Sequence, residues 1–119
     1  MNARKFVKRI REEVIEQNSK HYANMLNMPV SKVRDPRMRS IVAAFARMDS
    51  EQKEAVRLLL TQILLDTVSN LFGILDGSSL LEGFREQFVL TYGGSREKIN
   101  GDLQEMLLGT ETDNGSAKN

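Results

Sequence analysis

The sequence predicts a mainly α-helical fold of the α+β class. Three observations lead there: apolar residues recur at helical spacing over residues 3–75, capping residues separate the helical segments, and a short β-rich stretch follows. We expect three major helices with a long central apolar helix, a small C-terminal β-hairpin and a short last helix. The chain has 119 residues, of which 40% are hydrophobic, enough for one domain with a modest core. Residues 1–108 are predicted to form this single domain, and the polar residues 109–119 a disordered tail.

The first helix is expected over residues 3–27. Phe6, Ile10 and Val14 lie four residues apart, which is helical spacing. Polar residues at positions 17–19 interrupt this apolar face, so the sequence predicts that the helix bends, thins out or breaks there. After a connector, Asp35 precedes Pro36, an N-cap followed by proline at the first helical position. A second helix is therefore expected over residues 36–47.

The central helix is expected over residues 50–75. Asp49 and Gln52 have the spacing of a capping box, and Gly77 suits the left-handed position after a helix. The expected inward-facing residues are Val56, Leu59, Leu60, Ile63, Leu64, Val68, Leu71, Phe72 and Leu75. Further apolar residues lie outside this face, which predicts a central position or an oligomer contact; they are Leu58, Leu65 and Ile74.

The pattern changes after residue 86. Residues 87–92 (QFVLTY) are rich in β-formers, Gly93, Gly94 and Ser95 are typical of a turn, and residues 98–99 are expected to return as a second strand. Asp102 and Glu105 have capping-box spacing ahead of a short last helix over residues 103–108.

The composition excludes several kinds of chemistry. With no cysteine and one histidine, the chain cannot form disulfides, use a catalytic thiol or build a multi-histidine metal site. No catalytic motif is present, so we expect neither an enzyme nor a cofactor. The basic N-terminal segment lacks the apolar run of a secretory signal, which predicts a cytoplasmic protein. Arg57 and Asp66 interrupt the longest apolar segment and argue against a membrane span.

The net charge of +1 conceals an asymmetry. Residues 1–47 hold 11 Lys and Arg against 4 Asp and Glu (net +7), whereas residues 48–119 hold 6 against 12 (net −6). The two halves can neutralise each other, within one chain or across a dimer, or the basic half can bind an anionic partner. The candidate partner-binding residues are Arg4, Lys8, Arg11, Arg34, Arg37, Arg39 and, in a polar stripe of the central helix, Asp66.

Residues 64–77 (LLDTVSNLFGILDG) and 99–107 (INGDLQEML) carry a resemblance. Together they resemble small bacterial proteins of uncharacterised function, some of which are encoded beside toxin genes as immunity-type proteins. The likeness covers about residues 48–108 and implies an α+β binding protein without catalysis.

The predicted function is a non-catalytic protein-binding module. Its partner is expected to be a protein, and a homodimer is expected from the extra apolar surface of the central helix and the edge of the strand at residues 87–92. The alternative is a nucleic-acid-associated regulator that uses the basic N-terminal half. A pI near 8.0, rather than above 9, argues against this alternative.

Overall fold

The structure is a computed structural model that describes the backbone of residues 1–116 and the side chains of residues 1–109. It confirms a mainly helical protein with a long central helix, and it has no strand in the described part of the chain. The first helix is continuous but consists of three segments, α1, η1 and α2, and a short 3-10 turn, η2, follows it. The bounds are α1 Ala3–Ile10, η1 Arg11–Glu16, α2 Gln17–Leu26, η2 Val30–Lys32, α3 Pro36–Ala46, α4 Ser50–Asp76 and α5 Leu103–Ser116.

The first helix does not break at residues 17–19, so of the expected alternatives the break is wrong. Instead, the preceding segment η1 is a π-helix, in which the backbone N–H of Gln17 donates to the carbonyl of Glu12. Val7 and Ile15 are both buried in the core, yet residues eight apart point about 80° away from each other on an α-helix. The wider π turn takes up one extra residue and so brings Ile15 back to the buried face.

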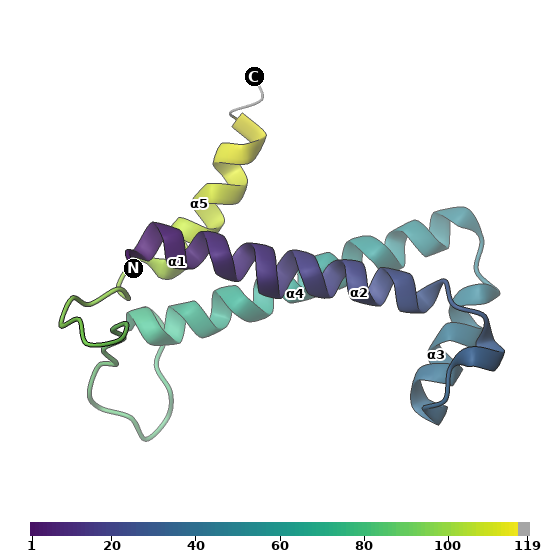
Figure 1. The fold of residues 1–119 in the computed structure, drawn as a ribbon, viewed down its shortest axis with the longest axis horizontal. Helices are drawn as coiled ribbons and strands as arrows, with labels where there is room; N and C mark the ends of the chain where they lie inside the picture. Colours follow the sequence, from purple (N-terminus) through teal and green to yellow (C-terminus); the bar gives the residue numbers. More distant parts are fainter. Residues whose placement is uncertain (117–119) are drawn as a thin grey trace.

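Two long helices form the body of the molecule. The first helix and α4 cross each other, while α3 and α5 lie at opposite ends (Figure 1). The extents of the molecule are 51 × 42 × 27 Å, and its radius of gyration is 18.0 Å. A compact protein of this length has a radius of gyration of about 13–14 Å, so the molecule is elongated. The core lies where α1 and η1 meet α4 and α5, and its buried residues are Val7, Ile15, Leu65, Val68, Phe72, Leu103 and Leu107.

The predicted caps of α3 and α4 are confirmed. The Asp35 side chain accepts a hydrogen bond from the backbone N–H of Arg37 (3.0 Å). Asp49 and Gln52 form a reciprocal capping box, with distances of 2.8 and 3.0 Å. Gly77 ends α4 with φ of 86°. This left-handed conformation is unfavourable for any residue that has a Cβ atom.

The predicted buried face of α4 is only partly correct. Val68 and Phe72 are buried as expected, but Leu59, Ile63 and Leu71 are more than half exposed. Leu65, which was expected to add outward-facing apolar surface, is buried in the core instead. The reason is that α4 is apolar on more than one face, so its sequence does not indicate which face packs against the first helix.

The predicted β-hairpin is wrong, although its turn is present. The chain reverses at Gly93, where the N–H of Ser95 donates to the carbonyl of Tyr92 (3.1 Å). A backbone hydrogen bond joins Ile99 N to Leu90 O (2.9 Å), but a strand ladder does not develop among the described residues. The Asn100 side chain takes its place by bonding the backbone of Phe88 and Leu90.

The last helix is longer than expected. Its backbone continues to Ser116, into the segment from Gly109 onward for which the sequence predicts a tail. Residues 117–119 of that segment lie outside the described residues.

Candidate functional site

Asn100 holds the junction between α4 and α5. It is 7% exposed, and its amide Nδ2 donates to the carbonyl of Leu75 at the end of α4 and to that of Phe88 (2.9 Å). Its Oδ1 accepts from the backbone N–H of Leu90 (2.8 Å). One side chain therefore satisfies three backbone groups that have no helix or sheet partner there.

Asp76 caps α5 from the end of another helix. Its two carboxylate oxygens accept from the backbone N–H groups of Gly101 (2.7 Å) and Gln104 (2.8 Å). The Gln104 amide in turn donates to the carbonyl of Ser69 (3.0 Å) on α4. Gly73 leaves room for this amide, since a Cβ there would lie 3.0 Å from Nε2. The N-cap that we expected from Asp102 thus comes from Asp76.

Both sequence segments singled out above, residues 64–77 and 99–107, contribute to this junction. Residues 64–77 supply Ser69, Gly73 and Asp76, and residues 99–107 supply Asn100 and Gln104. Their polar groups bond one another and the backbone, which is a structural task. No group of three or more His, Cys, Asp or Glu side chains that could hold a metal ion occurs in the described part of the chain.

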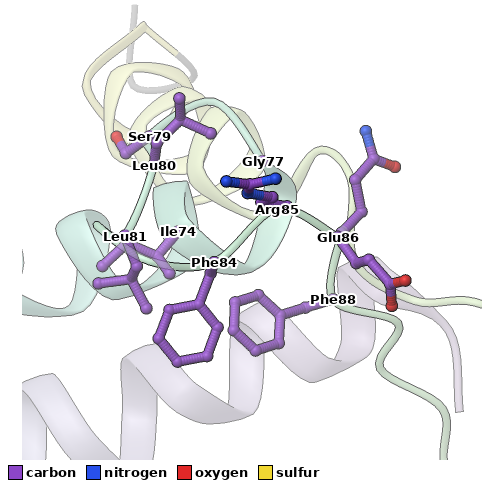
Figure 2. Close-up of a pocket in the computed structure, with 10 residues that line it drawn as sticks. Ile74, Gly77, Ser79, Leu80, Leu81, Phe84, Arg85, Glu86 and Phe88 are labelled. Carbon is purple, nitrogen blue, oxygen red and sulfur yellow. The ribbon is translucent and has the colours of Figure 1, made fainter.

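A shallow hollow lies in the loop that the junction closes. Figure 2 shows Phe84 and Phe88 with their rings side by side, near Leu81 and Ile74. The two ring centroids are 5.9 Å apart, within the range of attractive aromatic pairs. The hollow beside Ile74 and Leu81 has a volume of about 160 Å³, and a second, more open hollow lined by residues 83–88 has a volume of about 470 Å³. The smaller hollow has room for one side chain of a partner.

The candidate basic residues of the first helix have different environments. Arg4 and Lys8 are exposed on α1. Arg11 is half-buried in η1, and its guanidinium donates to the carbonyl of Leu107 on α5 (2.9 Å). Arg11 therefore joins two helices, whereas Arg4 and Lys8 are available to a partner.

The second basic cluster lies at the far end of the molecule. Arg34 and Arg37 are exposed beside the start of α3. Arg39 donates to the carbonyls of Val33 (2.8 Å) and Arg34 (3.1 Å) and so fixes the connector. Because α1 and α3 are at opposite ends (Figure 1), the structure does not bring the two basic clusters together.

The ion pairs within residues 1–109 are all local. Arg9 lies 4.0 Å from Glu12 and 3.9 Å from Glu13, and Arg57 lies 3.5 Å from Glu54. In this part of the chain, ion pairs do not join the basic half to the acidic half. The remaining candidate, Asp66, is exposed on α4 and accepts from the Gln62 amide one turn earlier (2.8 Å).

Sequence reasoning missed two features of possible functional use. The first is the outward row of Leu59, Ile63 and Leu71 on α4, which was assigned to the core; the excess of apolar residues on this helix was the available signal. The second is the exposed Phe84, which lies outside every predicted element, whereas its neighbour Phe88 lies in the predicted strand.

α4 is also long and apolar enough to cross a membrane. This is a finding of length and composition alone, and 28% of its most apolar 18-residue window is buried. Core helices of soluble proteins meet the same criterion.

Fold and surface together define an elongated, all-α protein with exposed apolar side chains on α4 and on the loop before α5. No known protein family, curated protein or solved structure matches the chain.

Proposed function

We propose that the chain is a non-catalytic protein-binding module whose partner docks on the loop between α4 and α5. The observation that carries this proposal is a set of large exposed side chains on that loop, called the loop cluster: Leu80, Phe84, Phe88, Val89 and Tyr92. Aromatic side chains that fill pockets supply much of the binding energy at protein interfaces.

The loop is held at its base. Asn100 and Asp76 fix both sides of it to the end of α4, and Gly83 and Gly93 adopt positive φ angles of 89° and 60° within it. A loop positioned by a stable scaffold is the usual carrier of binding residues. The small hollow beside Phe84 then suits one apolar side chain of the partner.

The nucleic-acid alternative has less support. A protein that follows a phosphate backbone needs a basic stripe along one face. Here the exposed residues Arg4 and Lys8 are separated from Arg34 and Arg37 by the length of the first helix, roughly 30 Å. Between them the helix carries the acidic residues Glu12, Glu13 and Glu16.

Photo-crosslinking tests this proposal. A photoreactive phenylalanine analogue at position 84 should capture a specific protein in the producing cell, and the same analogue at position 28 should not. Met28 is the matched control because it is also exposed but lies next to α3. The captured protein, once purified, should bind the Phe88→Ala variant at least about 10-fold more weakly, as expected for an aromatic anchor. Equal affinity for wild type and Phe88→Ala, or capture from position 28 alone, contradicts the proposal.

A further inference from the structure

The exposed face of α4 consists of two parallel rows. Residues four apart lie nearly above one another on a helix. The apolar row consists of Leu59, Ile63, Thr67 and Leu71, and the polar row beside it of Gln62, Asp66 and Asn70, with Leu58 at its start; all eight residues are exposed.

The first helix covers only the opposite side of α4. The shortest extent of the molecule is 27 Å, which is room for two layers of helices about 10 Å thick. Leu59, Ile63 and Leu71 are therefore 59%, 51% and 54% exposed. A mainly apolar row of this kind on a helix, interrupted only by Thr67, is typical of a packing surface.

We propose that this face binds the same face of a second copy of the chain, with the two α4 helices antiparallel about a two-fold axis. Rows at i±4 spacing on both helices can interdigitate, which is the most common class of helix packing. Because both partners then use the same kind of row, the contact is self-complementary, as a two-fold interface requires.

The order of residues in the rows selects the antiparallel arrangement. A two-fold axis perpendicular to the helices places apolar row on apolar row and polar row on polar row, with the direction reversed. Leu59 then faces Leu71 of the second copy, and Ile63 faces Thr67 of the second copy. In the polar row, Gln62 faces Asp66 of the second copy, so that its amide can donate to that carboxylate. A parallel pair would instead place leucines over the polar row.

The area of the face is adequate. Half-exposed side chains of this size contribute about 60–120 Å² each when buried, so eight residues cover about 500–1,000 Å². A standard stable interface buries about 800 Å² per partner.

Lipid and the C-terminal residues of the same chain fit the exposed face of α4 less well than a second copy does. Lipid would surround Asp66 and Asn70 as well as the leucines, and burying a carboxylate in a bilayer is costly. The C-terminal residues 110–119 (TETDNGSAKN) are mostly polar and offer no large apolar side chain to the apolar row.

Mass measurements test the proposal. Sedimentation equilibrium should give twice the 13.5 kDa chain mass for the wild type. The Ile63→Glu variant should dissociate at least about 30-fold more readily, since it places a charge on the apolar row. Leu80→Glu is the matched control, because Leu80 is 88% exposed in the loop and should leave the mass unchanged. A wild type that is monomeric up to millimolar concentration, including one that then binds lipid vesicles, contradicts the proposal.

Cysteine cross-linking tests the direction of the helices. The natural chain has no cysteine, so each introduced thiol is unique. Leu59→Cys and Leu71→Cys chains should form a disulfide-linked dimer when mixed and oxidised, whereas neither should form one alone. Efficient linkage of Leu59→Cys with itself would overturn the antiparallel arrangement. Self-association goes beyond the proposed partner binding at the loop cluster, and either can fail without the other.

Discussion

Asn100→Ala is the most direct test of the α4–α5 junction. The substitution removes the three hydrogen bonds to Leu75, Phe88 and Leu90. Each buried backbone group that loses its partner costs about 1 kcal/mol or more. We therefore expect the free energy of unfolding to fall by about 3 kcal/mol, a large part of the roughly 5–15 kcal/mol that stabilises a typical domain.

Urea denaturation followed by far-ultraviolet circular dichroism measures this loss. With a denaturant slope of about 2 kcal/mol per molar, the midpoint should fall by about 1.5 M. Protein concentration is kept constant, because any self-association stabilises the folded state. Asn24→Ala is the matched control, since Asn24 is exposed on α2 and alanine has the higher helix propensity. Its midpoint should stay unchanged or rise.

Asn100→Asp separates the roles of the two amide atoms. The carboxylate keeps the acceptor for Leu90 but directs an oxygen at the carbonyls of Leu75 and Phe88. We expect it to destabilise the protein at neutral pH as much as alanine does. Protonation at low pH restores one donor, so this variant should regain stability relative to Asn100→Ala as the pH falls. If the free energy of unfolding falls by less than about 1 kcal/mol in both variants, Asn100 does not stabilise the junction between α4 and α5 as argued.

Three further predictions concern the helix ends and the basic surface. Asp76→Ala should lower the free energy of unfolding by about 1–2 kcal/mol by removing the cap of α5, whereas Asp102→Ala should change it by less than about 0.5 kcal/mol; similar losses in both would place the cap at Asp102. Gly77→Ala should cost about 1–2 kcal/mol in the same assay, because its φ of 86° disfavours a Cβ, and an unchanged midpoint would contradict that reason. The Arg34→Glu/Arg37→Glu double variant should bind DNA and RNA no differently from the wild type at low salt, and a wild-type affinity that falls steeply with salt and is lost in the variant would restore the nucleic-acid alternative.

Local signals in the sequence were predictive. Asp35 before Pro36, the Asp49 and Gln52 pair, and Gly77 all act on backbone groups within a few residues, so their spacing alone identifies the helix ends. The existence and length of α4 followed from them. The loop turn at Gly93 was identifiable for the same reason.

Contacts between distant residues were not predictable from the sequence. The Asn100 side chain bonds Leu90, where a strand partner was expected. Asp76 replaces Asp102 as a cap, although 24 or more residues separate it from its donors. The π turn in the first helix is likewise a response to packing, because it brings Ile15 against α4. Each of these outcomes depends on which elements meet in space.

The same difficulty of predicting contacts between distant residues applies to α4 and bears on its function. A helix with one apolar face reveals its buried side, but α4 is apolar on two sides, so sequence alone predicts burial without direction. The structure assigns Leu65, Val68 and Phe72 to the core and leaves Leu59, Ile63 and Leu71 outside. Three residues that the sequence predicted to face the core are therefore the ones exposed for an interface. Their mixture with Gln62 and Asp66 argues for a protein surface over lipid, because a facing helix can satisfy these polar groups whereas a hydrocarbon layer cannot.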